Sequence, residues 1–380
     1  MTAKEQPVTR QPIERPADAV FVTGTGRCGS TLVSHLLRDH PRVLSLSELF
    51  NHLTDMYRLT ASVFPEGRCG AGQFWEILSA RHPVNRMLSR HGVAPKEVLY
   101  PVSETSRYTG ATGVPAVLLT TLPHLSDDPE ALYDEMATAV AGFPEATAGE
   151  HYARLFGWLC GRFDKDVWVE RSGGSLILAS QYLRHFPEAR FVHIVRDGRD
   201  VAVSMTRHHG FRMAAIVMGL GLAVGRDVYS LGPGELDALS PEQVPDDLRS
   251  FLPDRFDAEA FRAYAIPPSL FGAYWSDEME RGLAALSEVP RDRVLHLWYE
   301  DILDRPAESL GLLAEFLGPR YADDDWLRRC EARVAAPASA WTDLPPDERD
   351  RLDQACRKGF DVLSAHGVAR GARRPVGGAA

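Results

Sequence analysis

The sequence predicts an α/β fold in three layers, with a central parallel sheet between helices. Two stretches carry this prediction, because each reads as a short apolar strand, a turn and then a helix. In the first, residues 20–22 precede three glycines and a helical apolar pattern over residues 32–37. In the second, residues 191–195 precede a turn at residues 197–198 and another helical pattern. This alternation indicates right-handed crossovers, and such sheets bind ligands at the carboxyl ends of their strands.

The other expected elements continue the same alternation. After a strand at residues 43–46, helices are expected over residues 49–60, 71–81 and 128–141. The next helix, strand and helix are expected over residues 152–163, 166–170 and 175–186. A helix from about Asp200 follows the second turn. The remaining helix, strand and two helices are expected over residues 269–287, 293–298, 306–317 and 346–363, with Pro306 suited to a first helical position.

The 380 residues are expected to form one domain with two insertions. Residues 1–17 are rich in proline and polar groups, which predicts a disordered leader. The domain spans residues 18–368, with loop-rich insertions at about residues 51–150 and 207–268. The first is expected to lie over the nucleotide face as an acceptor-binding lid, and both are expected to build the acceptor pocket. Residues 369–380 are expected to be a disordered tail.

The composition narrows the classes of function and location. A formal net charge of −10 argues against a general nucleic-acid surface. The five cysteines are scattered without a C-x-x-C pair, so neither a disulfide framework nor a zinc site is expected. The first residues lack the apolar core of a signal peptide, which predicts a cytoplasmic location. The longest apolar run, residues 214–224, is too short to span a bilayer.

The glycine-rich turn at residues 24–29 is suited to hold a phosphate or sulfate group. Its glycines allow an anion to approach backbone N–H groups at the positive end of a helix dipole. Arg27 adds a charge with forked donors, and Ser30 and Thr31 offer hydroxyls from the first helical turn.

Two other nucleotide-binding patterns share this turn. The spacing fits the triphosphatase loop G-x-x-x-x-G-K-[ST], except that Ser30 stands at the lysine position. It also fits the dinucleotide pattern G-x-G-x-x-G, with Glu48 near the position of a ribose-binding acid. The second turn favours a third class of nucleotide-binding protein. Its Arg196 and Ser204 suit a second phosphate, so the ligand would be a nucleoside that is anionic at both its 5′ and 3′ ends.

The two motifs together resemble the sulfotransferases that use 3′-phosphoadenosine 5′-phosphosulfate (PAPS), in particular tyrosylprotein and bacterial sulfotransferases. The resemblance covers roughly residues 19–48, 166–205 and 274–317. It implies the P-loop-like sulfotransferase architecture and a 5′-phosphosulfate loop made of Gly26, Arg27, Cys28, Gly29, Ser30 and Thr31. It also implies a 3′-phosphate site made by Arg196 and Ser204 and a nucleotide contact from Tyr299, whereas Arg199 has a structural role as its alternative.

The same resemblance suggests the catalytic residues. Glu48 matches the general base of the tyrosylprotein enzymes, and the alternative is an acid at a helix N-terminus with Ser47 as the cap. Arg27 would stabilise charge on the transferred group. Arg171 stands where relatives carry a lysine, so it would stabilise charge without donating a proton readily, unless it forms only a structural ion pair. His52 is the reserve base, whereas the pair His208-His209 is expected in a solvated loop.

The sequence therefore predicts transfer of a sulfuryl group from PAPS to a hydroxyl of a small-molecule or lipid-like acceptor, releasing 3′,5′-adenosine bisphosphate (PAP). The mechanism requires no metal, and no nucleic-acid partner is expected. A nucleotide kinase or triphosphatase, a dinucleotide oxidoreductase and a non-catalytic nucleotide-binding scaffold remain as alternatives. The apolar residues 211–224 are expected to form a buried helix, with an acceptor pocket as the alternative. The acceptor and the oligomeric state are left open.

Overall fold

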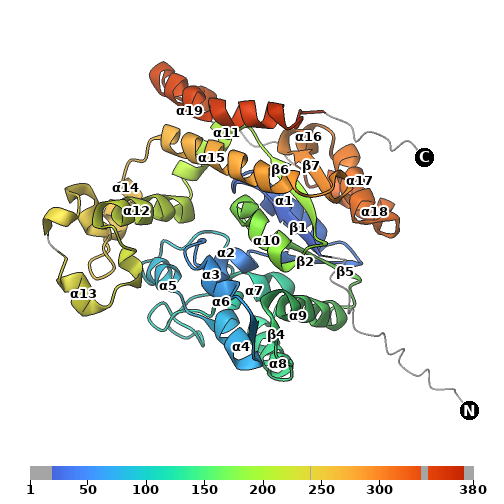
Figure 1. Cartoon of the computed structure of the whole chain (residues 1–380), viewed down its shortest axis with the longest axis horizontal. Helices are drawn as coiled ribbons and strands as arrows, with labels where there is room; N and C mark the ends of the chain where they lie inside the picture. Colours follow the sequence, from blue (N-terminus) through green and yellow to red (C-terminus); the bar gives the residue numbers. More distant parts are fainter. Residues whose placement is uncertain (1–18, 240, 335–340, 372–380) are drawn as a thin grey trace, which may run out of the picture.

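The structure is a computed structural model of the chain, and it describes residues 19–239, 241–334 and 341–371 (Figure 1). The predicted leader at residues 1–17 and the last nine residues of the predicted tail lie outside this part. Residues 369–371 are described, and the backbone N–H of Gly371 donates to Asp301 Oδ2 at 2.8 Å.

The centre of the molecule is a five-stranded sheet in which all neighbouring strands are parallel. Its order is β2-β5-β1-β6-β7. The strands are β1 (Val20–Thr23), β2 (Val43–Ser47), β5 (Val167–Arg171), β6 (Arg190–Val195) and β7 (Val294–Trp298). The register places Val22 beside Arg171 on one side and Val192 on the other. The predicted α/β fold with a central parallel sheet is confirmed.

Alternate residues of each strand pack on opposite faces of the sheet, as a buried parallel sheet requires. Val20 and Val22 lie in a core with the apolar sides of three helices, α1 (Ser30–Arg38), α17 (Pro306–Leu317) and α18 (Asp324–Glu331). Phe21 faces the other way and stacks on Tyr182 at 4.1 Å between ring centroids. The helices of that second face are α9 (Ala148–Arg162), α10 (Ala179–His185), α11 (Gly198–Thr206), α15 (Pro268–Ser287) and α19 (Pro346–Ala365).

The first insertion is mainly helical and lies below the sheet in Figure 1. Its helices are α2 (Leu49–Leu53), α3 (Thr60–Val63), α4 (Ala71–Ser79), α5 (Pro83–Arg90), α6 (Ala116–Leu119), α7 (Thr121–Leu125) and α8 (Pro129–Ala141). Two short strands that the sequence did not reveal, β3 (Arg68–Cys69) and β4 (Ala146–Thr147), pair antiparallel and join the segment after α3 to the segment after α8.

The predicted helix over residues 49–60 is wrong, because α2 ends at Leu53. Asp55, Met56 and Tyr57 follow with φ angles of 48°, 58° and 68°. Three consecutive residues in the left-handed region cannot continue a right-handed helix. Buried contacts fix this turn, since Asn85 Nδ2 donates to Asp55 Oδ1 at 2.9 Å and Arg58 pairs with the same carboxylate. The turn brings Tyr57 into contact with the backbone carbonyl of Gly173.

The second insertion forms the yellow lobe at the left of Figure 1. It contains α12 (His209–Val224), α13 (Pro233–Asp237) and α14 (Ala258–Ala263), with 3-10 turns η3 (Val228–Ser230), η4 (Pro241–Gln243) and η5 (Asp246–Phe251). Met213, Ile216 and Leu220 pack with residues of α5 and η5 in a separate small core. The other described elements are η2 (Ser175–Leu178), η6 (Arg291–Arg293), α16 (Tyr299–Asp304), η7 (Pro319–Tyr321) and η8 (Trp341–Asp343).

Candidate active site

The turn between β1 and α1 presents backbone at the carboxyl edge of the sheet. Gly26, Arg27 and Gly29 have φ angles of 75°, 51° and 93°. No side chain caps the first turn of α1, so its N–H groups face the loop at the positive end of the helix dipole. A Cβ atom on Gly29 would lie 2.1 Å from the ring of Tyr299, so glycine is required for the turn and for this close approach.

The turn after β6 lies directly beside this loop. Arg27 Nε donates to Ser204 Oγ at 3.1 Å, and Arg196 Nη1 donates to the backbone carbonyl of Arg27 at 3.1 Å. The guanidinium of Arg196 lies 4.9 Å from the centroid of the Tyr299 ring. Arg196 Nε is buried and has no hydrogen-bond partner within the described part of the chain. Because a buried charged donor without a partner is costly, this atom fits a bound anion such as a phosphate.

Two other residues of these motifs are directed away from the loop. Arg199 forms ion pairs with Asp197 and Asp353, and its guanidinium lies 4.1 Å from the ring of Trp341. It therefore fastens α19 to the start of α11. The Cys28 thiol lies in the core, where burial raises its pKa, so only the backbone of Cys28 can contact a ligand at the loop.

Glu48 follows β2 in the left-handed region, with a φ angle of 58°. Its Oε1 pairs with Arg171, and its Oε2 accepts from the backbone N–H of Gly173 at 3.0 Å. Glu48 also stands directly before α2, as the alternative interpretation expected, but its carboxylate accepts no hydrogen bond from that helix, and the expected Ser47 cap is wrong. Ser172 Oγ accepts instead from the N–H groups of Phe50 and Asn51 in the first turn.

Arg171 is 2% exposed and holds the Glu48 carboxylate in place. Its Nη2 also donates to Ser47 Oγ at 3.0 Å, whereas its Nε is a further buried donor without a partner among the described residues. The neighbouring residue, Glu170, is fully buried, and this burial raises the pKa of its carboxyl to about 8. Glu170 is therefore neutral at pH 7, and the ion pair at this point is the one between Arg171 and Glu48.

The structure adds two residues that the sequence analysis did not select. Glu97, from the loop after α5, accepts from Arg27 Nη1 at 2.8 Å and lies 2.9 Å from His208 Nε2. Burial favours a higher pKa for Glu97, but the hydrogen bond from His208 and the charges of His208 and Arg27 outweigh it and lower the pKa to about 2. His208 is thus part of the site and not of a solvated loop. Nothing in the sequence around Glu97 indicated that it would pair with Arg27 and His208.

His52 lies close to the same cluster but has a different partner. Its Nε2 lies 2.7 Å from Thr120 Oγ1, and burial lowers the pKa of the imidazole to about 4. His52 is therefore neutral at pH 7.

Within the residues that the structure describes, no group of three or more His, Cys, Asp or Glu side chains is arranged to hold a metal ion.

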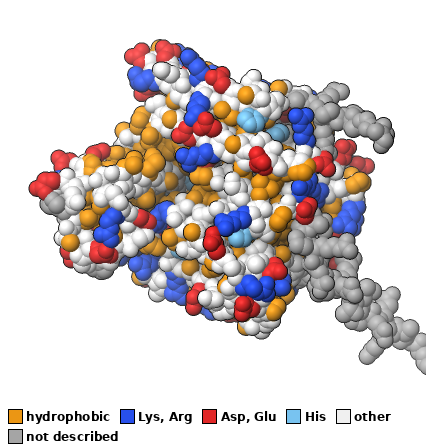
Figure 2. Space-filling view, viewed as in Figure 1, with side chains coloured by type: hydrophobic (Ala, Val, Ile, Leu, Met, Phe, Trp, Pro, Cys, Tyr) orange, Lys and Arg blue, Asp and Glu red, His pale blue; other side chains and the backbone are white. Residues whose placement is uncertain are grey.

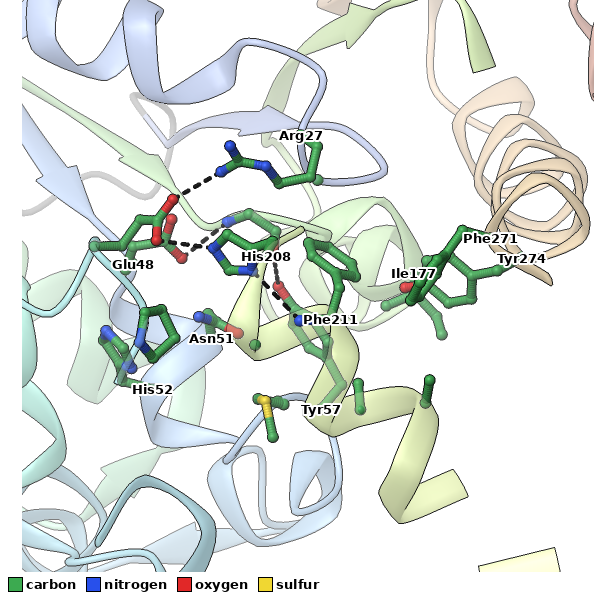
Figure 3. A pocket seen from close by; sticks show the side chains of 18 of the residues that line it. Arg27, Glu48, Asn51, His52, Tyr57, Ile177, His208, Phe211, Phe271 and Tyr274 are labelled. Carbon is green, nitrogen blue, oxygen red and sulfur yellow. Dashed lines mark hydrogen bonds and ion pairs between the residues drawn. The ribbon is translucent and has the colours of Figure 1, made fainter. Parts of the chain in front are cut away.

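A cavity of about 230 Å³ opens beside these groups. In Figure 3, Arg27, Glu48 and His208 lie at one end, Ile177, Phe271 and Tyr274 at the other, and Phe211 between them. The apolar wall comes from α12, α15, η2 and the turn after α2, and its members are Met56, Tyr57, Ile177, Phe211, Ala214, Ala215, Met218, Leu270, Phe271 and Tyr274. The expectation that residues 211–224 form a wholly buried helix is wrong, because one face of α12 lines the cavity and Met218 is 49% exposed.

Among the described residues, no helix is long and apolar enough to cross a membrane.

No curated protein shows a significant match to the sequence. Similar solved structures include the sulfotransferase domain of the olefin synthase from Synechococcus PCC 7002, with 14% identity and a TM-score of 0.41 over 96% of this chain and 98% of that domain. The sulfotransferase domain from the curacin biosynthetic pathway shares 12% identity, with a TM-score of 0.43 over 94% of this chain and 99% of that domain. The sulfotransferase STF9 of Mycobacterium avium shares 15% identity, with a TM-score of 0.40 over 92% of this chain and 77% of that protein.

Two family models match the sequence directly. The model described as "Sulfotransferase domain" matches residues 180–333, a range that includes the Arg196 turn and Tyr299. The model described as "Sulfotransferase family" matches residues 19–223, more than half of the chain, including the glycine-rich loop, Glu48 and the Arg196 turn. The chain belongs to the sulfotransferase family.

Proposed function

We propose that the protein transfers a sulfuryl group from PAPS to a hydroxyl of a small-molecule or lipid-like acceptor and releases PAP. The observation that carries the proposal is the direct contact between the two motifs, in which Arg27 reaches Ser204 and Arg196 reaches the backbone of Arg27. One nucleotide that is anionic at both its 5′ and 3′ ends would engage both turns. The unpaired donor of Arg196 and the uncapped start of α1 support this fit.

The donor site is built from residues with distinct tasks. Backbone N–H groups of Gly26 to Thr31, with the hydroxyls of Ser30 and Thr31, would hold the 5′-phosphosulfate. Arg196 and Ser204 would hold the 3′-phosphate, and the ring of Tyr299 would lie against the nucleotide. Arg27 would turn from Glu97 toward the sulfuryl group and offset the negative charge that develops on the bridging oxygen during transfer.

Glu48 is our proposed general base, and its place at the cavity supports this role. A carboxylate can accept about four hydrogen bonds, and its contacts with Arg171 and Gly173 leave room for the acceptor hydroxyl. Arg171 does not line the cavity, so we assign it to positioning Glu48 and to balancing charge, in place of direct contact with the transferred group. In the transfer, the acceptor oxygen bonds to sulfur, the bond from sulfur to the phosphate oxygen breaks, and the hydroxyl proton moves to Glu48.

The alternatives fit the same residues less well. Ser30 stands at the position of the lysine that a nucleotide kinase or triphosphatase uses, and no lysine of the described residues lines the cavity. In a dinucleotide enzyme Glu48 would bind a ribose, but its carboxylate contacts Arg171 and Gly173. A non-catalytic nucleotide-binding scaffold would keep the loops without using Glu48 as a base.

A ligand panel tests the donor, and a turnover assay tests the reaction. At about 100 times its dissociation constant, PAP should stabilise the fold by about 2.7 kcal/mol in a thermal-shift measurement, whereas ATP with magnesium and NAD should give small shifts. Transfer of radiolabelled sulfate from PAPS to an alcohol should then be measurable. A larger shift with ATP or NAD than with PAP would reject the proposed donor, and PAP binding without any transfer would favour the scaffold.

A further inference from the structure

The surface around the mouth of the cavity carries an unusual concentration of exposed apolar side chains. Within the described residues, five large hydrophobic side chains are exposed, and three of them, Ile177, Met218 and Leu270, line the cavity. A fourth, Leu222, is 79% exposed and follows Met218 by one turn of α12. Figure 2 shows hydrophobic side chains gathered over α12 and the start of α15, at the left of the view.

These side chains continue a stripe that begins inside the cavity. On α12, Phe211, Ala215, Met218 and Leu222 follow one another at spacings of three and four residues, which places them on one face of the helix. Phe211 and Ala215 line the cavity, whereas Leu222 lies on the outer surface. At a rise of 1.5 Å per residue, the stripe extends about 16 Å from the cavity outward.

Charge is confined to the other end of the cavity. The Asp, Glu, Lys and Arg side chains that line the cavity are Arg27, Glu48 and Glu97. Arg27, Glu48 and His208 lie at the end away from the stripe (Figure 3), and Glu97 contacts both Arg27 and His208. The stretch of α12 from Met213 to Val224 contains no charged residue. Arg27 is the single lysine or arginine among the lining residues, and our proposed reaction uses it for the donor. A second anionic group on the acceptor would therefore find no cation along this path.

Building on the proposed function, we infer that the acceptor is an uncharged, elongated aliphatic alcohol. Its hydroxyl lies between Glu48 and Arg27, and its chain passes Phe211 and Tyr274 and continues along the apolar stripe of α12. The continuity of the stripe with the cavity favours the substrate as its occupant over a separate partner. Met218 and Leu222 then determine the preferred chain length. The transfer forms a sulfate monoester at the end of the chain and releases PAP and one proton.

A series of 1-alkanols from butanol to hexadecanol, kept below their solubility limits, tests this inference with PAPS as donor. Burying one methylene contributes about 0.8 kcal/mol, so KM should fall about fourfold per added carbon until the chain passes Leu222, while kcat changes little. Leu222→Glu should remove the gain for the longest alkanols and leave butanol unchanged. Ala223→Glu is the matched control, because it adds the same charge at an exposed position of the same helix about 100° away from Leu222.

Several outcomes separate this inference from the proposed function. If PAP does not bind and no alcohol is sulfated, the proposed function itself fails. If PAP binds and transfer occurs, but KM does not depend on chain length or both variants behave alike, only the aliphatic acceptor is rejected. If Leu222→Glu loses binding to phosphatidylcholine vesicles and keeps the alkanol KM values of the unmodified protein, the stripe is a membrane contact and the inference is also rejected. Leu222→Ser, which adds no charge, should show a weaker form of the Leu222→Glu effect.

Discussion

The two halves of the carboxyl edge of the sheet balance charge in different ways. At the ends of β1 and β6, Arg27 pairs with Glu97, which comes from an insertion, whereas Arg196 donates to the backbone carbonyl of Arg27 and forms no ion pair among the described residues. At the ends of β2 and β5, the charges of Arg171 and Glu48 cancel within a buried pair. The first half therefore keeps a positive charge for a ligand, and the second half is neutral without one.

In the proposed reaction, this difference separates nucleotide binding from proton transfer. A positive, partly unpaired site gains stability when an anion arrives, because the anion replaces water and completes the hydrogen bonds of the arginines. A neutral pair changes little when the ligand binds and can hold a carboxylate in a fixed position. Substitutions in the first half should thus affect mainly nucleotide affinity, and those in the second half should affect mainly rate or stability.

The largest expected effect is on the rate of Glu48→Gln. The amide cannot accept the hydroxyl proton, so kcat should fall by about 10² to 10⁴, whereas PAP affinity should change little because Glu48 belongs to the neutral half. Rapid-quench measurement of sulfate transfer and calorimetric titration of PAP would give the two values. Activity that remains within tenfold of the unmodified protein would remove Glu48 from the mechanism.

A stability control is needed, because Glu48→Gln leaves Arg171 buried without a carboxylate. Breaking such a pair costs about 3–5 kcal/mol of unfolding free energy. The double variant Glu48→Gln with Arg171→Met should regain much of this stability, since it removes the unpaired charge. It should remain inactive, which would distinguish loss of the base from loss of the fold. Recovery of activity in the double variant would contradict the assignment.

In the positive half, Arg196→Gln should weaken PAP binding by about 10- to 100-fold, because a hydrogen bond to a charged group contributes about 1.5–3 kcal/mol. Binding of adenosine 5′-phosphate, which lacks the 3′-phosphate, should change much less. Calorimetric titration of both nucleotides tests this difference. Arg199→Gln is the matched control, since Arg199 pairs with Asp353 and Asp197 and should affect the stability of the α19 contact without changing PAP affinity. Equal losses for the two nucleotides would place Arg196 outside the 3′-phosphate site.

The turns at the sheet edge could be predicted better than the rest of the site, and the reason is chain connectivity. The turns after β1 and β6 each combine strand, turn and helix signals within about 20 consecutive residues, so both could be found from the sequence. Glu97, His208 and Tyr274 come together from three separate segments. Their positions depend on packing between distant segments, and an isolated acidic or aromatic residue in a sequence does not indicate such packing. The acceptor end of the cavity could therefore not be predicted in detail.

The turn after α2 shows how tertiary contacts can override a local pattern. Apolar residues continue beyond Leu53 at a spacing that suits a helix, which led to the expected helix over residues 49–60. The buried carboxylate of Asp55 instead binds Asn85 and Arg58, and the backbone adopts left-handed angles to allow these contacts. The sequence contains no glycine at this turn, so nothing local indicated the positive φ angles.

The smallest expected effect concerns pH and stability in the neutral half. The buried Glu170 has a pKa of about 8, above the usual value of 4.5, so the folded protein keeps this proton between these pH values while the unfolded chain loses it. Because the folded state then binds more protons, the free energy of unfolding should fall as pH rises from about 4.5 to 8, by up to about 1.4 kcal/mol per pH unit. Glu278, whose pKa burial also raises, contributes in the same direction.

Glu170→Gln should reduce this slope, because glutamine has no proton to lose and can occupy the same space. Urea denaturation at pH 5.5, 6.5 and 7.5 would measure the slope, and the exposed Glu76→Gln controls for the loss of one carboxyl group. PAP affinity should be the same in both variants, since Glu170 does not line the cavity. An unchanged slope would mean that Glu170 is ionised in the folded protein at pH 7. The β2 and β5 half would then carry a net negative charge, and its contrast with the arginine-rich half would be one between opposite charges.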